Sequence, residues 1–319
     1  MLALWIILVQ VLFYCGLTSI LSQKRESIPI WPEGHVPYPI VHDLDPKSDR
    51  GIRDERDGVI HSIHVPTVTY SKYKTITELS SVAIVLYPGG AYRKISYDKE
   101  GVRIADLLNR IGIHVFILKY RHSPYVHPVP LIDGLQSIRF VRAHAALYGF
   151  SKHLIGVMGL SAGGHLAACV ATLYNSNLFK VPSPTDTFKD IQEQSARPDF
   201  VVLLHPVVAM GSEYAHTLTK TNLLGTDQSD ERVSEISPHK NVEKDTPPMF
   251  ILHTGEDLHV PSENSLLMYQ ALHHKKIHAE LHIYAEGGHG LDMTNVTNVL
   301  PVNLEWPGQF QRWLIRLQL

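Results

Sequence analysis

Short runs of apolar residues alternate with longer amphipathic stretches along most of this 319-residue chain. Runs such as Ser81–Tyr87 and His114–Leu118 are typical of strands buried on both faces of a parallel sheet. The stretch between them, Val102–Arg110, predicts a helix, which gives a strand-helix-strand unit. The same pattern predicts further strands at Leu154–Gly159, Phe200–Leu204, Met249–His253 and Ala279–Tyr284, and helices at Leu131–Ala145, Ala162–Tyr174, from near Pro261, and at Asn303–Leu317.

This alternation predicts an α/β fold, with a mostly parallel, doubly wound sheet and helices on both faces. One domain over residues 23–319 is expected, because 44% hydrophobic content at this length provides one large core. Residues Ile28–Arg56 are expected as an extended arm that leads into short antiparallel strands near Ile60–Tyr73. Two later segments, 175–197 and 209–245, have no clear period. We expect them to be surface excursions near the carboxyl edge of the sheet, without a large lid domain.

The first 22 residues differ from the rest of the chain. Met1–Leu21 is apolar with few interruptions, and the sequence turns polar at Ser22–Arg25. This pattern predicts a secretory signal peptide, and therefore a secreted or periplasmic protein. An uncleaved membrane anchor carrying an exported domain is the competing interpretation, because about 20 apolar residues also span a bilayer as a helix. A buried N-terminal helix is a third.

The charge balance of the chain narrows the class of ligand. The chain has 29 Lys and Arg residues against 31 Asp and Glu residues. This near-neutral balance does not favour nucleic acid or a polyanionic substrate, so a neutral ligand fits better.

The two cysteines, Cys15 and Cys169, exclude a disulfide framework because the first lies in the apolar leader. Stability is therefore expected to come from the core.

A candidate nucleophile stands between a predicted strand and a predicted helix. Ser161 lies in Gly159-Leu160-Ser161-Ala162-Gly163. A serine hydroxyl is a weak nucleophile at neutral pH, so it must be presented on a tight turn with an imidazole within hydrogen-bond reach. The flanking glycines allow the turn to close without Cβ clashes. The pentapeptide alone is a weak signal, and its strand and helix flanks make it specific.

A glycine-rich segment follows the first buried strand, where hydrolases of this kind place one side of the oxyanion hole. The segment reads Pro88-Gly89-Gly90-Ala91. The N–H of Gly90 is expected to hold the oxyanion together with that of Ala162, and with that of Gly89 or Ala91. A simple turn after a strand is the structural alternative.

Two further turns supply an acid and a base in the order that a Ser-acid-His arrangement requires. Asp257 follows the strand Met249–His253, and the neighbouring Glu256 is its rival. His289 lies in Glu286-Gly287-Gly288-His289-Gly290, after the last predicted strand. Glycines on both sides let it approach Ser161 closely. His259 is the main competitor for the base, although it lies only two residues from Asp257.

In combination these motifs resemble the α/β-hydrolase esterases related to acetylxylan esterases and feruloyl-type carbohydrate esterases, some of whose relatives carry xylanase names. The resemblance implies an α/β-hydrolase fold, a triad of Ser161, Asp257 and His289, and oxyanion donors from Gly90 and Ala162. Pro88 departs from lipase-like relatives, which have a histidine in that loop, so small acyl groups on sugars are favoured. The matching segments are Ile30–Gly34, Pro88–Tyr92, Pro130–Asp133, Gly159–Leu166 and Glu286–Gly290.

Asp133 and His165 also match the family pattern, and we interpret them as structural residues that hold the helix and the nucleophile turn in place. The implied reaction is hydrolysis of a small-molecule or oligosaccharide ester through an acyl-serine, with no cofactor and no metal. An arylformamidase or a general short-chain carboxylesterase would use the same triad with a different pocket. A catalytically silent hydrolase fold that acts as a binding module is the alternative from another class.

Overall fold

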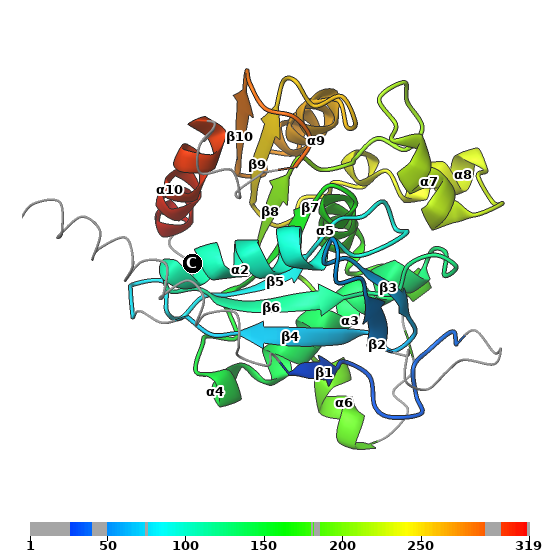
Figure 1. The fold of residues 1–319 in the computed structure, drawn as a ribbon, viewed down its shortest axis with the longest axis vertical. Helices are drawn as coiled ribbons and strands as arrows, with labels where there is room; N and C mark the ends of the chain where they lie inside the picture. Colours follow the sequence, from blue (N-terminus) through cyan, green and yellow to red (C-terminus); the bar gives the residue numbers. More distant parts are fainter. Residues whose placement is uncertain are drawn as a thin grey trace, which may run out of the picture.

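The computed structural model describes residues 26–39, 50–73, 76–179, 181, 186–290 and 301–317; the predicted leader over residues 1–22 lies outside them. The described residues form an eight-stranded sheet in the order β1-β4-β6-β5-β7-β8-β9-β10, and β2 pairs with β3 separately (Figure 1). Neighbours from β6 to β10 are parallel, whereas β4 and β1 continue the sheet antiparallel. The strands are β1 Ser27–Pro29, β2 Arg50–Arg53, β3 Ile60–Ile63, β4 Thr67–Ser71, β5 Ala83–Tyr87, β6 His114–Lys119, β7 Ile155–Leu160, β8 Phe200–Leu204, β9 Met249–Thr254 and β10 Ala279–Tyr284.

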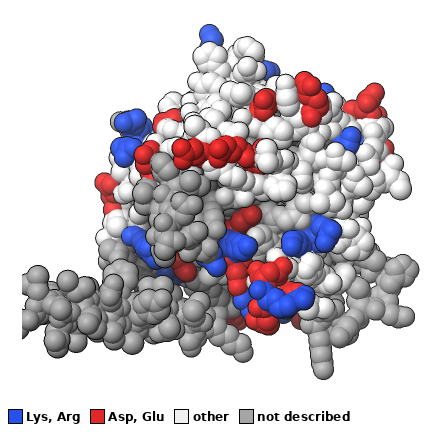
Figure 2. Space-filling view, turned by 45° about the horizontal axis from the view of Figure 1, so that its top comes forward, with Lys and Arg blue, Asp and Glu red and all other residues white. Residues whose placement is uncertain are grey.

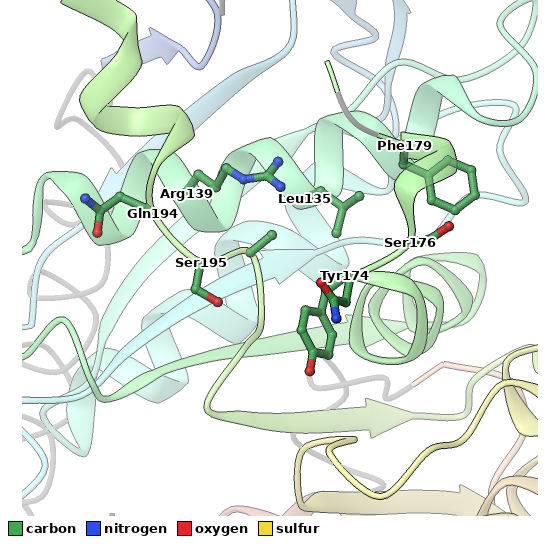
Figure 3. Close-up of a pocket in the computed structure, with 9 residues that line it drawn as sticks. Leu135, Arg139, Tyr174, Ser176, Phe179, Gln194 and Ser195 are labelled. Atoms are coloured by element: carbon green, nitrogen blue, oxygen red, sulfur yellow. The ribbon is translucent and has the colours of Figure 1, made fainter. Parts of the chain in front are cut away.

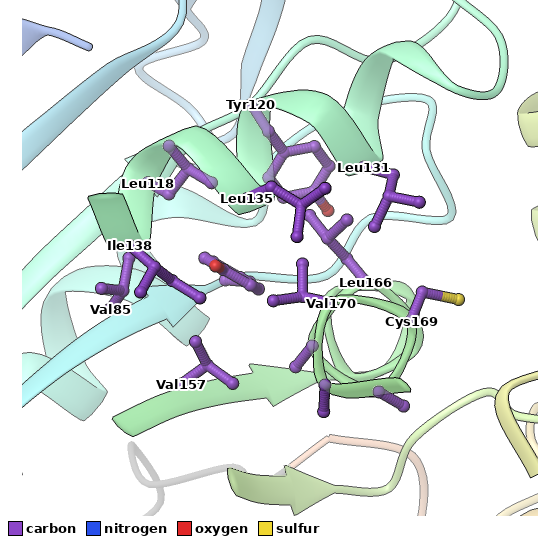
Figure 4. Packing of buried hydrophobic residues seen from close by; sticks show 14 of the residues in the cluster. Val85, Leu118, Tyr120, Leu131, Leu135, Ile138, Val157, Leu166, Cys169 and Val170 are labelled. Atoms are coloured by element: carbon purple, nitrogen blue, oxygen red, sulfur yellow. The ribbon is translucent and has the colours of Figure 1, made fainter. Parts of the chain in front are cut away.

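Helices cover both faces of this sheet, as the apolar runs predict. Val85 of β5 packs with α3 and α5 on one face, and Figure 4 shows this cluster closing over Val157 of β7. Ile84, the residue before Val85 in β5, points to the opposite face, where α2 and α10 pack. The helices are α2 Arg103–Arg110, α3 Val129–Ala143, α4 Ala145–Tyr148, α5 Ala162–Leu173, α6 Asp186–Gln192, α7 Thr217–Leu224, α8 Asp230–Glu235, α9 Glu263–His274 and α10 Pro301–Arg316, with a π-helical turn at Tyr97–Val102.

The predicted α/β fold is confirmed, and the predicted strands and helices named above begin and end within two residues of those in the structure. The arm and the antiparallel strands are also present: β1 and β2 lie in the arm, and β3 and β4 follow it. Strands β1 and β4 occupy one edge of the eight-stranded sheet, and β2 and β3 form the separate pair. The carboxyl ends of the parallel strands are followed by other segments of the chain.

The two excursions contain helices that their irregular sequences did not indicate, and the first lies elsewhere than expected. Helix α6 packs on α3, and the carbonyl of Ser195 accepts a bond from Arg142, which also pairs with Asp199. Asp199 directly precedes β8 and accepts the N–H of Ile155, the first residue of β7. The described part of segment 175–197 therefore lies toward the amino edge of the sheet, and its placement at the carboxyl edge was wrong. The reason is that α5 has already carried the chain to the amino edge, where β8 begins.

The second excursion, 209–245, follows the carboxyl end of β8 and carries α7 and α8. Asn222 of α7 donates a hydrogen bond to the carbonyl of Ala91, at 2.8 Å. The N–H of His127 donates to the carbonyl of Leu223 at 2.7 Å and fastens the same helix to the loop before α3. This excursion therefore lies at the carboxyl edge, as predicted.

Candidate active site

The turn at Ser161 joins β7 directly to α5. Its backbone has φ 54° and ψ −121°, a conformation that a residue with a side chain rarely adopts. A Cβ at Gly163 would lie 2.0 Å from the carbonyl oxygen of Tyr87, and one at Gly159 would lie 2.1 Å from that of Gly163. Both glycines are therefore required for the turn to close against β5. Strand order also changes direction here, because β6 and β7 flank β5 on opposite sides, a position where α/β sheets bind ligands.

The structure brings the three predicted triad side chains into one hydrogen-bonded chain. His289 Nε2 lies 2.8 Å from Ser161 Oγ, and His289 Nδ1 lies 2.6 Å from Asp257 Oδ2. The three residues follow β7, β9 and β10, so the parallel strands deliver them to one edge. The carboxylate accepts from Nδ1–H, which leaves Nε2 free to take the Ser161 proton. This is the arrangement that nucleophilic catalysis by serine requires.

Asp257 is fixed by more than His289. Its Oδ1 accepts the backbone N–H groups of His259 at 3.0 Å and Val260 at 2.9 Å, and His253 Nε2 lies 3.4 Å from its Oδ2. Burial alone would raise the pKa of Asp257, but the bonds from His253, His289 and the Val260 N–H outweigh it and hold the pKa below its usual range. The carboxyl group is therefore ionised and available to orient His289.

The two rivals named from the sequence have other positions. Glu256 Oε2 accepts the N–H of Gly287 at 3.0 Å, so it fastens the loop that carries His289. His259 gives its backbone N–H to Asp257, and its ring packs against His289 with the ring centroids 5.7 Å apart. The choice of Asp257 and His289 therefore agrees with the geometry.

The candidate oxyanion hole needs one correction. Among the described residues, the N–H groups of Gly90, Ala91 and Ala162 have no acceptor. The N–H of Gly89 instead donates to Glu100 Oε2 at 2.6 Å, so the prediction of Gly89 as an oxyanion donor was wrong. It failed because Glu100 folds back over the loop. Gly90, Ala91 and Ala162 remain the candidate donors.

One buried histidine at this edge was not predicted. His205 follows β8 and is 3% exposed, and its ring meets that of His289 edge to face with centroids 4.7 Å apart. Neither of its ring nitrogens has a hydrogen-bond partner in the described residues. Burial, followed by the proximity of His289, lowers its pKa well below the usual value, so the ring is neutral. Its place directly after a buried parallel strand was the available signal.

Asp133 and His165 have the structural roles predicted for them. Asp133 is fully buried and accepts from Arg121 Nη2 at 2.6 Å, from Arg121 Nε at 2.8 Å and from Trp31 Nε1 at 3.2 Å. His165 bonds to the Tyr92 hydroxyl at 2.9 Å and to the carbonyl of Ile236 at 2.7 Å. The first ties the N-terminal arm to α3. The second ties α5 to the second excursion.

A cavity of about 160 Å³ lies away from the three triad residues. It opens between α3 and the chain after α5, where Arg139, Tyr174 and Ser195 line it (Figure 3). Since α5 starts after Ser161 and has 12 residues, its far end is about 18 Å from the serine, so this cavity is separate from the candidate active site.

Among the described residues, no group of three or more His, Cys, Asp or Glu side chains is arranged to hold a metal ion. No helix in the described ranges is long and apolar enough to cross a membrane. On the face seen in Figure 2, Lys and Arg lie close to Asp and Glu, so that face presents charges of both signs.

Comparison with known proteins identifies the family. The BD-FAE family model matches residues 70–272. The chain belongs to the BD-FAE family. The acetyl ester-xyloside bifunctional hydrolase from Caldicellulosiruptor lactoaceticus shares 34% identity with it, at a TM-score of 0.75, and the match covers 93% of this chain and 98% of that one. The matched structures are α/β hydrolases, and the fold of this BD-FAE member is the α/β-hydrolase fold.

Two curated relatives carry names from xylan degradation. Endo-1,4-beta-xylanase B of Butyrivibrio fibrisolvens is 34% identical over 216 residues, which is 66% of this chain and 33% of that protein. Acetylxylan esterase of Xylanibacter ruminicola is 31% identical over 215 residues, which is 66% of this chain and 41% of that protein. The resemblance drawn from the motifs is therefore confirmed. The BD-FAE chain spans less than half the length of these two relatives.

Proposed function

We propose that this BD-FAE member is a serine carboxylic-ester hydrolase that removes small acyl groups, in particular acetyl, from carbohydrate esters. One observation carries the proposal: His289 lies between Ser161 Oγ, at 2.8 Å, and Asp257 Oδ2, at 2.6 Å. The N–H groups of Gly90, Ala91 and Ala162, which have no acceptor among the described residues, support it.

The reaction follows from these contacts. Ser161 Oγ attacks the ester carbonyl while His289 Nε2 takes its proton, and Asp257 stabilises the imidazolium. The N–H groups of Gly90, Ala91 and Ala162 stabilise the oxyanion of the tetrahedral intermediate. His289 then protonates the departing alcohol, and an acyl-serine remains. Water, activated by the same histidine, hydrolyses that ester and restores Ser161.

The substrate class rests on a different kind of support. The relatives are named as acetylxylan esterase and xylanase B, and the solved relative as an acetyl ester-xyloside hydrolase. Pro88, in place of the histidine of lipase-like loops, agrees with a small acyl group rather than a lipid chain. An acetylated xylan or xylo-oligosaccharide is therefore the proposed substrate.

Hydrolysis of an aryl acetate tests the reaction. The purified protein should release acetate from 4-nitrophenyl acetate, and Ser161→Ala should abolish this release. An aryl phosphonate should label the wild-type protein at Ser161 with one group per chain. Equal turnover by the Ser161→Ala protein would refute the assignment of the nucleophile. Absence of both turnover and labelling would favour the catalytically silent alternative.

A panel of substrates tests the specificity separately. It contains acetylated xylan, a feruloyl ester, a formylated aromatic amine and longer-chain aryl esters. The highest kcat/KM is expected for the acetylated carbohydrate. Preference for the formylated amine would identify an arylformamidase, and preference for simple aryl esters a general short-chain carboxylesterase, each with the same triad.

We further propose that the leader directs export. The apolar run Met1–Leu21, followed by Ser22–Arg25, supports a signal peptide. Expression of the full chain in a secreting host, followed by N-terminal sequencing, tests this. Cleavage near residue 22 is expected, whereas an uncleaved chain recovered in the membrane fraction would identify an anchor.

A further inference from the structure

Two side chains from outside the oxyanion loop hold it on either side of its free N–H groups. The loop is the segment Pro88–Tyr92, between β5 and the π-helical turn. Glu100 accepts the N–H of Gly89 at 2.6 Å, ahead of the free groups. Asn222 Nδ2 donates to the carbonyl of Ala91 at 2.8 Å, behind them.

The loop needs such support because its backbone is strained. Gly90 has φ 133°, and the next two residues, Ala91 and Tyr92, have φ 53° and 52°. Residues with side chains in this region cost on the order of 1–3 kcal/mol each, and they persist only where the surroundings fix them. A Cβ at Gly90 would lie 2.0 Å from the carbonyl oxygen of Lys94, so the turn is also tightly packed.

Backbone hydrogen bonds hold the two peptide planes that carry the Gly90 and Ala91 N–H groups. The carbonyl of Gly89 accepts from Ser96 N–H at 2.9 Å, and that of Gly90 from Arg93 N–H at 3.0 Å. These bonds shape the turn from within. Glu100 and Asn222 hold the peptide planes on either side of these two, because they bond the Gly89 N–H and the Ala91 carbonyl. The Tyr120 hydroxyl donates to the Pro88 carbonyl at 2.7 Å and holds the first of these flanking planes together with Glu100.

The carboxyl group of Glu100 can hold the loop, but its position does not favour a negative charge. The position that a Cβ would take at Gly89 lies 2.7 Å from Glu100 Oε2 and 2.9 Å from Ser161 Cβ, so the carboxyl group is beside the nucleophile. Desolvation raises its pKa, although the Gly89 N–H opposes this. An ionised carboxylate there would repel the oxyanion of the intermediate, so an uncharged acceptor would serve the loop as well.

Asn222 gives the second excursion a part in the site. It lies on α7, which the bond from His127 N–H to the Leu223 carbonyl holds in place at 2.7 Å. Its amide reaches the loop across 131 positions of sequence. Among the described residues no other hydrogen bond joins α7 to this loop, so Asn222 is the link between them.

We propose that Glu100 and Asn222 are positioning residues that orient the N–H groups of Gly90 and Ala91 toward the oxyanion. This inference rests on the proposed ester hydrolysis at Ser161. Neither side chain exchanges a proton with the substrate. Their contribution is made in the transition state, because they set donors that bind the oxyanion more strongly than the ground-state carbonyl.

Substitutions at Glu100 separate the hydrogen bond from the charge. Glu100→Gln keeps a carbonyl acceptor for the Gly89 N–H and should hold kcat within about threefold of wild type. Glu100→Met keeps the length without an acceptor and should lower kcat about a hundredfold, the effect of displacing a catalytic group by about 1 Å. KM for the aryl acetate should change little. Affinity for a boronic acid that mimics the tetrahedral intermediate should fall in parallel with kcat.

Substitutions on α7 provide the second, independent arm. Asn222→Leu removes the donor at similar size and should lower kcat and boronate affinity in the same manner, by about tenfold to a hundredfold. Thr221→Leu, on the exposed neighbouring position, is the matched control and should leave both unchanged. Thermal melting of every variant identifies any that fails to fold.

The outcomes separate this inference from the proposed function. If Glu100→Gln loses as much kcat as Glu100→Met, the charge is needed and the positioning role is wrong. Wild-type kcat in both Glu100→Met and Asn222→Leu also overturns it, because a folded, phosphonate-labelled enzyme would then work without either contact. Failure of the proposed function has a different signature: the wild-type protein itself neither turns over the ester nor takes up the phosphonate.

Discussion

Asp257 Oδ2 accepts a hydrogen bond from His289 Nδ1 at 2.6 Å, whereas the adjacent Glu256 bonds to the N–H of Gly287 at 3.0 Å. Two neighbouring carboxylates thus act on one loop in different ways. Asp257 orients the imidazole, and Glu256 fastens the backbone two residues before it. Substitutions that preserve shape should distinguish these roles.

Asp257→Asn should lower kcat about ten-thousandfold, because the amide cannot hold His289 in the tautomer with Nε2 free. Glu256→Gln keeps an oxygen that accepts the Gly287 N–H, so its effect on kcat should stay below about tenfold. Steady-state kinetics with an aryl acetate measures both. The assignment of the acid is wrong if the larger loss appears in Glu256→Gln.

The turn at Ser161 gives a steric prediction. Gly163→Ala places a Cβ 2.0 Å from the Tyr87 carbonyl oxygen, so β5, the oxyanion loop or the turn itself must move. Since a shift of about 1 Å costs about a hundredfold in rate, kcat should fall at least that far. Gly288→Ala, whose Cβ meets nothing within 4 Å, is the control and should keep most of the activity although it adjoins His289. Comparable losses in the two variants would contradict this account.

The triad was predictable because it depends on order along the chain. Residues that follow the carboxyl ends of parallel strands meet at one edge, so strand prediction was enough to bring Ser161, Asp257 and His289 together. The apolar runs that form β5 and β7 to β9 are buried on both faces, which makes them conspicuous in sequence.

Contacts that depend on how irregular segments fold back were not predictable. Glu100 reaches Gly89 because the intervening chain turns and Ser96 N–H bonds the Gly89 carbonyl. Asn222 lies in a segment without a period, and nothing local indicates its distance from Ala91. The same limit explains the misplacement of segment 175–197, whose position depends on the length of α5 and on the packing of α6 against α3.

His165 gives a prediction on pH. Its burial lowers the pKa to about 4, below the value of about 6.5 expected in the unfolded chain. Between these values the unfolded state takes up a proton that the folded state does not, so stability is full above about pH 6.5 and falls as the pH drops. His165→Gln should remove about 1.4 kcal/mol per pH unit from that slope, measured by urea unfolding from pH 7 to pH 4.5. An unchanged slope would show that His165 is already protonated in the folded state.

The buried ion pair between Arg121 and Asp133 predicts a substitution that lowers stability and leaves kcat nearly unchanged. Both side chains are fully buried, and two bonds at 2.6 and 2.8 Å join them. Asp133→Asn leaves the guanidinium charge unpaired in the core and should lower the free energy of unfolding by about 3–5 kcal/mol.

Below the unfolding transition, kcat for an aryl acetate should stay within about twofold, because Asp133 ties the N-terminal arm to α3 and does not touch the triad. Glu243→Gln, which breaks the exposed pair with Lys275, is the control and should leave the unfolding midpoint in urea unchanged. A folded, stable Asp133→Asn protein with strongly reduced kcat would instead make Asp133 part of the active site, since the loss would then arise from the chemistry and not from the core.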